Sequence, residues 1–220
     1  MDINRLIDST LLRPEATRAQ VIKLCEDALE HGFASVCVNP YYVDVANAVL
    51  AGSDVGTCVV IGFPLGATGS SVKVAEAEYV LDRGARELDM VMNVGALKSG
   101  EPGAVEDDIK SVVERCARNA LVKVILECSL LSDGEIVEAC RIAVAAGADF
   151  VKTSTGFGPG GATVHDVQLL KSTVAGHALV KASGGIGDLA TAMAMVDAGA
   201  DRIGTSQGVA IAIEAARRDG

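Results

Sequence analysis

Two lysines, Lys152 and Lys181, lie within the short apolar segments "DFVKTST" and "LVKAS". If these segments are strands, successive side chains face opposite sides, and Val151 and Val180 on one face leave both lysines on the other. Burying a lysine charge is costly unless it is paired, and a second cation nearby raises that cost. An amine whose pKa is lowered in this way can attack a carbonyl carbon and form an imine. The spacing therefore predicts covalent chemistry through a lysine.

Carboxylates that could exchange protons with these lysines occur in other apolar segments. In "ELDMVMN" the side chains of Leu88 and Met90 take one face, which puts Asp89 on the inner face. Asp8 lies near the end of "LIDST", and Glu127 in "VILEC" is a further candidate. Such a carboxylate, directly or through one water, can move the protons that imine chemistry requires. The plainer alternative is two structural ion pairs, each lysine with Asp8, Asp89 or Glu127.

Glycine-rich stretches follow the last three apolar segments: "STGFGPGG", "SGGIGD" and "GTSQG". Glycine lets backbone N–H groups approach an oxyanion closely, although tight turns need glycine too. Their position beside two inner lysines predicts a phosphate site, with candidates Gly184, Gly185, Gly204 and Ser206. The hydroxyls and glycines directly after Lys152, Thr155 among them, are expected at the edge of the substrate pocket.

Cys37 is the inner residue of "ASVCVN", between Val36 and Val38 on the outer face. It could be a nucleophile, but no histidine stands in a matching position and its neighbours are apolar. We therefore expect Cys37 in the wall of the pocket. Solvated or capping roles are expected of the three histidines, which fall in or beside helical segments: His31, His165 and His177.

Eight apolar segments recur, each about one strand-plus-helix unit from the next. They are "RLIDST", "ASVCVN", "CVVIGFP", "ELDMVMN", "VKVILECS", "FVKTST", "LVKASGG" and "RIGTSQG". Helical segments between them start at capping residues, namely Thr17, Ser132, Thr163 and Asp188. The joints "RGAREL", "AGADFV" and "AGADRI" each end a helix at a glycine that can take a left-handed conformation.

This alternation within 220 residues predicts an α/β fold, a (β/α)8 TIM barrel formed by a single domain over residues 1–220. An open doubly wound sheet is the alternative. It usually needs fewer units and often carries a glycine fingerprint after its first strand, where this chain has "LLRPEAT". In a barrel both lysines fall late in their strands, on the face that carries active sites. That position favours catalysis over structural ion pairs.

Composition excludes several classes of protein. The net charge of −10 disfavours nucleic acid or an anionic membrane as a partner, since both require a basic surface. No apolar run is long enough to span a membrane and no signal peptide is recognised, so a cytoplasmic protein is expected. The six cysteines contain no CxxC pair and no zinc-site spacing, which predicts reduced, packed thiols and no metal site.

The chain resembles the 2-deoxy-D-ribose-5-phosphate aldolases, a family of lysine-dependent class I aldolases. The resemblance runs through "IDSTLL", "ASVCVNP", "VIGFPLGA", "GARELDMVMN", "ECSLL", "GADFVKTSTGF", "VKASGGI" and "RIGTSQG", in the family's order. It implies that Lys152 is the Schiff-base lysine and that Lys181 depresses the pKa of Lys152 and assists proton transfer. Asp89 and Asp8 would form the proton relay. Cys37 matches a pocket cysteine, and the phosphate would be bound at Gly156, Gly184, Gly185 and Ser206.

The resemblance also implies the reaction, which is reversible cleavage of 2-deoxy-D-ribose 5-phosphate to acetaldehyde and D-glyceraldehyde 3-phosphate in deoxyribose phosphate catabolism. The imine serves as electron sink, so no metal and no organic cofactor are expected. A homo-oligomer, a dimer or larger, is common among such barrels. Two alternatives remain open: another phosphosugar lyase or isomerase on the same barrel, and a non-catalytic phosphosugar-binding sensor.

Two departures from the family pattern bear on substrate preference. Many relatives have histidine where this chain has Ser9, and many have isoleucine, arginine and threonine where this chain has Ile186, Gly187 and Asp188. An arginine lost and an aspartate gained near the phosphate loop are expected to weaken phosphate affinity or to shift substrate preference.

Overall fold

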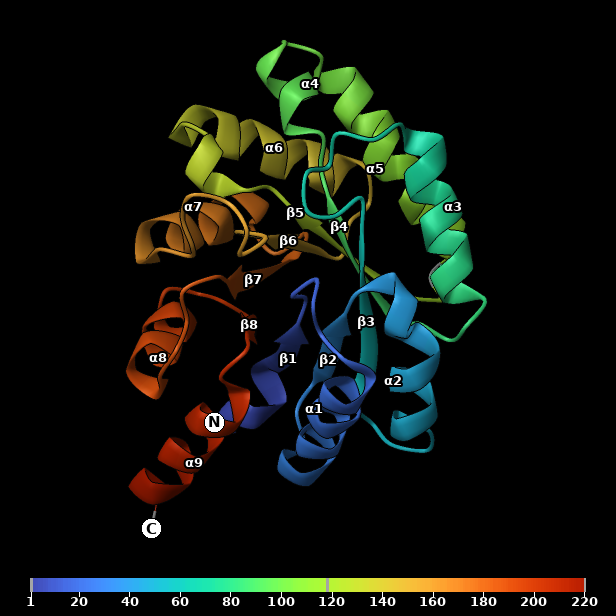
Figure 1. The fold of residues 1–220 in the computed structure, drawn as a ribbon. Coiled ribbons are helices and arrows are strands. Elements are labelled where there is room, and N and C mark those ends of the chain that lie inside the picture. Colours follow the sequence, from blue (N-terminus) through green and yellow to red (C-terminus); the bar gives the residue numbers. More distant parts are fainter. Residues whose placement is uncertain (1, 118, 220) are drawn as a thin grey trace.

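A computed structural model describes residues 2–117 and 119–219, and its eight parallel strands close into a barrel in the order of the sequence. Figure 1 shows the strands as a central ring with helices outside it. The predicted (β/α)8 TIM barrel is confirmed. The strands are β1 Ile7–Leu11, β2 Ser35–Val38, β3 Gly56–Ile61, β4 Glu87–Val91, β5 Leu121–Ile125, β6 Phe150–Lys152, β7 Leu179–Ser183 and β8 Arg202–Thr205.

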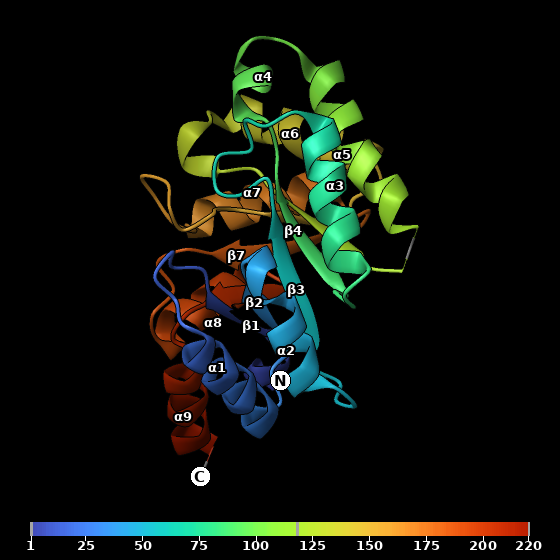
Figure 2. The same ribbon diagram turned by 45° about the vertical axis from the view of Figure 1, so that its right-hand side comes forward.

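Helices cover the outside of this ring, and both ends of the chain lie at the same end of the molecule (Figure 2). The helices are α1 Arg18–His31, α2 Val43–Leu50, α3 Ser70–Leu81, α4 Val94–Lys98, α5 Pro102–Cys116, α6 Asp133–Ala145, α7 Val164–Val174, α8 Leu189–Asp197 and α9 Gly208–Asp219. Short 3-10 turns occur at Ile3–Leu6, Pro40–Tyr42 and Cys128–Leu130. Within the described ranges, no helix combines the length and the apolar character needed to cross a bilayer.

The helix starts follow the capping pattern of the sequence. The Thr17 and Ser132 side chains each accept a hydrogen bond from a backbone N–H three residues on, and both complete a capping box. The Thr163 and Asp188 side chains also accept from a backbone N–H three residues on, at the starts of α7 and α8. Glycines at the three predicted helix-to-strand joints have positive φ: Gly84 (88°), Gly147 (87°) and Gly199 (113°).

The two faces of the strand ring differ in chemistry. Outward side chains such as Leu88, Met90, Val151 and Val180 pack with the helices in one apolar core, as predicted. Each fully buried side chain of this kind stabilises the fold by roughly 1.5–3 kcal/mol. The inward face holds a small apolar cluster and, beside it, most of the buried charge of the molecule. The fold thus reserves the barrel interior for polar side chains.

Candidate active site

Asp89 is the centre of a buried ion-pair network inside the barrel. Its Oδ2 accepts hydrogen bonds from Lys152 Nζ at 2.6 Å and from Lys181 Nζ at 2.7 Å. Its Oδ1 accepts one from Lys123 Nζ at 2.9 Å. Burial alone would raise the pKa of Asp89, but the three ammonium groups outweigh it and hold the pKa well below its usual value. Asp89 is therefore a carboxylate that stays ionised and holds three amines.

Strand pairing brings the two predicted lysines together. Lys152 is the last residue of β6, Lys181 is the middle residue of β7, and the two are partners in the register of these strands. Both side chains point into the barrel, as the alternation predicts. Burial would lower the pKa of Lys181, but the attraction of Asp8 and Asp89 outweighs burial and holds that pKa above its usual value.

Asp8 joins the network through Lys181 and Arg202. Its Oδ2 lies 2.5 Å from Lys181 Nζ, and its Oδ1 accepts from Arg202 Nε at 2.8 Å. Asp8 is the second residue of β1, so the expectation that it lies near the strand end is wrong. This deeper position explains why it reaches Lys181 and no ion pair joins it to Lys152 among the described residues.

Two further cations of the network were missed from the sequence. Lys123 of β5 lies 2.5 Å from Glu87 and 2.9 Å from Asp89, and Arg202 of β8 donates to Glu87 at 2.7 Å. The alternation that revealed Lys152 applies to "LVKVI" as well, because Val122 and Val124 pack outward in the apolar core. Lys123 was therefore detectable by the same signal.

Glu127 does not join this network. It follows the end of β5, and its left-handed backbone (φ 57°) breaks the alternation on which the expectation depended. Its carboxylate instead accepts a hydrogen bond from the Thr155 hydroxyl and lies 3.3 Å from the Thr155 backbone nitrogen. Glu127 thus ties the loop after β6 to the end of β5.

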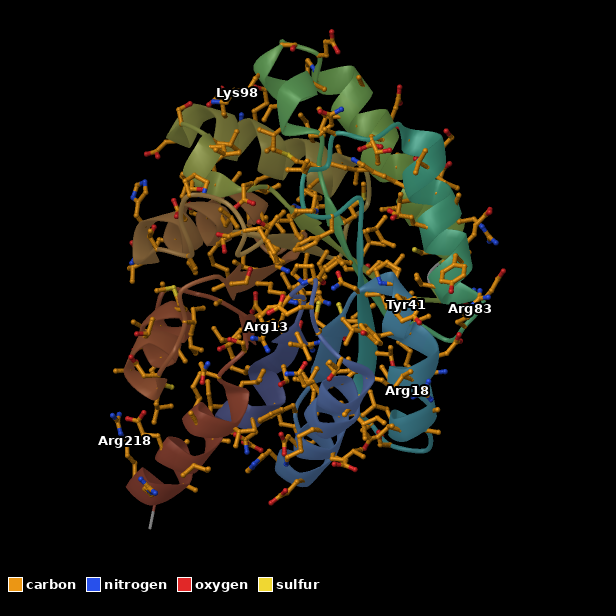
Figure 3. The ribbon with its side chains drawn as sticks, in the orientation of Figure 1. Arg13, Arg18, Tyr41, Arg83, Lys98 and Arg218 are labelled. Atoms are coloured by element: carbon orange, nitrogen blue, oxygen red, sulfur yellow. The ribbon has the colours of Figure 1, made fainter. Side chains whose placement is uncertain are left out.

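A pocket of about 840 Å³ opens at the carboxyl ends of the strands. Among the described residues that line it, Lys152 and Arg13 are the only charged ones, and none is acidic. Figure 3 shows Arg13 near the middle of the view, whereas Arg83, Lys98 and Arg218 lie at the periphery. The pocket also contains most of the predicted substrate-binding residues, namely Thr155, Gly156, Gly184, Gly185, Gly204 and Ser206.

Two glycines are required by close contacts: Gly204, which lines the pocket, and Gly161 in a loop beside it. A Cβ on Gly161, in the loop after β6, would lie 2.3 Å from the carbonyl oxygen of Gly184, so these two loops meet backbone to backbone. A Cβ on Gly204 would lie 2.9 Å from Ser183 Cβ and 3.0 Å from Lys181 Cε. Gly204 therefore leaves the space that the Lys181 side chain occupies.

Cys37 lies behind the pocket and not in its wall. It is fully buried beside Cys58, and Leu12, which packs in the same small cluster, lines the pocket in its place. The Cys37 Sγ is 3.9 Å from Asp89 Oδ2. The inner face of β2 is as predicted, but the residue sits too deep to face the pocket.

The two departures from the family pattern differ in position. Gly187 lines the pocket, and Asp188 next to it accepts a hydrogen bond from Thr191 N at 2.7 Å as the N-cap of α8. That hydrogen bond lowers the pKa of Asp188, so the carboxylate stays charged at the helix N-terminus. Ser9 is buried within β1, outside the set of pocket-lining residues.

Comparisons with known proteins agree with this architecture. Deoxyribose-phosphate aldolases from Geobacillus sp. (strain WCH70) and Brevibacillus brevis are 55% and 56% identical to the chain, covering 96% of it and 94% and 95% of the relatives. The solved structure "QR15, an Aldolase" has a TM-score of 0.95 at 44% identity and covers 100% of this chain and 98% of that one. A tetrameric deoxyribose phosphate aldolase from Aeropyrum pernix has a TM-score of 0.91 at 38% identity, covering 97% of this chain and 91% of that one.

The family signature spans nearly the whole barrel. Residues 5–214 match the DeoC/LacD family aldolases. With the lysine network and the pocket in the same barrel, the chain belongs to the DeoC/LacD family of aldolases.

Proposed function

We propose that the chain reversibly cleaves 2-deoxy-D-ribose 5-phosphate to acetaldehyde and D-glyceraldehyde 3-phosphate through a Schiff base on Lys152. The observation that carries this assignment is the position of Lys152. Of the three lysines that hold Asp89, it is the one that lines the pocket. The other two lie deeper, with no exposed side-chain surface.

The charges of the network are not balanced. Four cationic side chains face three carboxylates in the network: Lys123, Lys152, Lys181 and Arg202 against Asp8, Glu87 and Asp89. An unpaired charge in a dry interior is costly, and the four cationic side chains therefore share too few carboxylates. Ion pairing raises the pKa of Lys123, Lys181 and Arg202 despite their burial, and these groups keep their protons. Lys152 pairs with Asp89 alone among these carboxylates, so it is the lysine of the network with the fewest ion pairs to lose.

The reaction then follows from the placement of these groups. Lys152 Nζ adds to the C1 aldehyde and water leaves, which gives the imine. The C3 hydroxyl loses its proton, the bond between C2 and C3 breaks, and its electron pair moves into the imine to form the enamine. Protonation at C2 and hydrolysis release acetaldehyde and restore Lys152. Asp89 orients Lys152 and Lys181 through one oxygen, so that the Lys181 ammonium can serve the proton transfers.

The phosphate group is assigned to the part of the pocket formed by the loops after β7 and β8. The loops that precede α8 and α9 line it, and helix N-termini attract anions through their free N–H groups and dipoles. Arg13 adds a positive side chain, and the absence of acidic residues from the described lining favours an anion further. A strongly acidic chain thus keeps one locally positive pocket.

Borohydride trapping tests the covalent step. The protein is incubated with acetaldehyde and sodium borohydride, and the control omits the aldehyde. Alkylation of Lys152 blocks trypsin there, so the expected labelled peptide spans residues 142–171. Label on another lysine, or none, would overturn the assignment. Lys152→Ala is expected to lose trapping and to lose more than the roughly 10²–10⁴-fold that acid–base catalysis typically contributes.

Substrate competition tests the phosphate assignment. Arg13→Ala should raise KM for deoxyribose 5-phosphate and leave KM for unphosphorylated deoxyribose unchanged. Lys98→Ala, which removes a distant half-exposed cation on α4, is the matched control. Equal KM changes for the two sugars would contradict a phosphate contact at Arg13.

The proposed function also concerns where the chain acts and how it assembles. The chain is proposed to act in the cytoplasm, in the catabolism of deoxyribose phosphates, and to form a homo-oligomer. The tetrameric relative from Aeropyrum pernix supports assembly. Size-exclusion chromatography with light scattering measures the oligomeric state directly.

A further inference from the structure

Cys37 and Cys58 form a pair of free thiols inside the barrel that the proposed reaction does not use. They are register partners on the adjacent strands β2 and β3, and both are fully buried. Neighbouring strands lie about 4.7–4.9 Å apart, within the roughly 4.4–6.8 Å Cα separation that disulfides span. The two Sγ atoms lie within 4.8 Å of each other. Rotation about the side-chain bonds can therefore close the gap without moving a strand.

The same two thiols contact the centre of the charged network. Cys58 Sγ is 3.1 Å from Asp89 Oδ1 and 3.3 Å from Lys123 Nζ, and Cys37 Sγ is 3.9 Å from Asp89 Oδ2. Cys37, Cys58 and Asp89 lie close enough together to suggest a metal site. The three ammonium groups on Asp89 argue against a divalent cation there, because they repel it and already occupy both carboxylate oxygens.

We propose that Cys37 and Cys58 are an oxidation site, at which a peroxide converts the two thiols into a disulfide that reversibly inactivates the enzyme. The Cys37 thiolate attacks one peroxide oxygen, which gives a sulfenic acid and releases water after protonation. The Cys58 sulfur then displaces the sulfenic oxygen, and its own proton leaves with that oxygen as a second water. Each sulfur loses one electron and the peroxide gains two.

The surroundings assign different roles to the two thiols. The hydrogen bond from Cys58 lowers the pKa of Cys37 against the opposing effects of burial and Asp89, and Lys181 and Lys152 lower it further. Burial, together with Cys37 and Asp89, raises the pKa of Cys58. Cys37 is thus the thiol that reacts first, and Cys58 is the one that resolves it.

The remaining cysteines are poor competitors for the oxidant. Burial raises the pKa of Cys25 and Cys140 to about 12 and that of Cys116 to about 11. Burial also raises the pKa of Cys128. None of the four is a register partner of another cysteine in the described strands. Among the described cysteines, Cys37 and Cys58 are therefore the pair that combines a thiol of lowered pKa with a neighbouring thiol.

A small oxidant has a short route to this pair. Leu12 packs against the cluster of Cys37, Cys58 and Val60 and also lines the active-site pocket. The Leu12 side chain thus connects the thiol cluster with the pocket. A bound sugar phosphate should slow the oxidation, because it fills the space from which a peroxide must enter.

The experiment treats the full chain with graded hydrogen peroxide, blocks free thiols under denaturing conditions, and maps the peptides without reduction. Trypsin alone leaves Cys25, Cys37 and Cys58 in one peptide, residues 24–73, so chymotrypsin is added to cut after Tyr42. A Cys37–Cys58 linkage should appear in parallel with at least a tenfold loss of activity. Dithiothreitol should restore the activity. Activity lost without this linkage would overturn the proposal.

Two variants separate the disulfide from general damage. Cys58→Ser should give no linkage and no activity that dithiothreitol restores after peroxide, measured against its own untreated activity. Cys140→Ser, a buried cysteine of α6 far along the chain, should respond to peroxide as the unaltered chain does. The linkage measurement on the unaltered chain needs no variant and no activity assay, so it stands even if Cys58→Ser fails to fold. An identical dithiothreitol-reversible loss in Cys58→Ser would contradict the pairing.

Discussion

Lys123 shows how a buried residue can support a pocket that it does not line. Its ammonium group is fully buried and pairs with Glu87 and Asp89, and it lies 3.6 Å from Asp8. It does not line the pocket. Its contribution is to hold the carboxylate on which Lys152 and Lys181 converge.

Replacing this residue measures that contribution. Lys123→Met leaves buried carboxylates without their cation, and breaking such a pair typically costs about 3–5 kcal/mol. The free energy of unfolding in urea should fall by that amount. Lys110→Met is the control, since Lys110 is more than half exposed and its pair with Glu114 spans 4.0 Å, a type worth about 0–1 kcal/mol. If both variants lose the same free energy of unfolding, Lys123 does not stabilise the network.

The sequence predicted these residues as far as strand alternation holds. Lys152, Lys181, Asp89 and Cys37 all point inward, as their apolar neighbours indicate. The prediction for Glu127 was wrong because this residue lies beyond β5 in a left-handed conformation, and side chains alternate between faces only within a strand. The depth of each inward side chain along the barrel axis was also not predictable from the sequence. It depends on register between strands, which one strand's pattern does not contain.

At the scale of elements, β8 and the loops after β6 and β7 are fitted to each other by glycine. Gly204 is the sharpest case, because a methyl group there would crowd Lys181 Cε. The strands and helix caps themselves were predicted correctly, since periodicity and capping are local properties. The contacts between loops are not local, and no pattern along the chain predicts them.

Gly204→Ala tests this fit. Lys181 is fixed at its tip by Asp8 and Asp89, so a displaced stem must shift the ammonium group. We expect kcat to fall at least about tenfold, since a small misplacement of a catalytic group can cost about 10²-fold. Gly134→Ala is the control, because nothing lies within 4 Å of the added carbon. Unchanged kcat in Gly204→Ala, with folding verified by thermal melting, would show that the stem tolerates the methyl group.

The start of α8 offers a second test at this scale. Asp188 caps the helix with a charged carboxylate, next to the loop assigned to phosphate. Asp188→Asn keeps a capping oxygen and removes the charge. KM for deoxyribose 5-phosphate should fall about twofold to fivefold, because the phosphate no longer meets a negative charge beside its loop. Deoxyribose without phosphate should show no change, and an equal shift for it would place the effect elsewhere.

For the whole molecule, the buried network makes the stability of the fold depend on pH in the acidic range. The pKa values of Asp8 and Asp89 are depressed in the folded chain, because the surrounding cations outweigh burial. Their contribution is fully present above about pH 4, the pKa of an aspartate in an unfolded chain. It is lost as the pH falls through their lower folded-state pKa values.

The thermal midpoint should therefore drop as the pH is lowered from about 4 to about 2. Surface carboxylates also titrate in this range, so the informative quantity is the difference between two chains. Asp89→Asn should melt at a lower temperature at pH 5 and show a flatter dependence below it. Parallel curves for the two chains would mean that Asp89 does not contribute.

The origin of the network's members along the chain has a consequence for folding. All three carboxylates come from β1 and β4, and all four cations come from β5, β6, β7 and β8. Each half of the barrel alone would carry an interior lined with charge of one sign. The halves are thus complementary as acid and base, and neither can bury its inner face without the other. Fragments cut between β4 and β5 should stay unfolded when separate and recover a barrel when mixed.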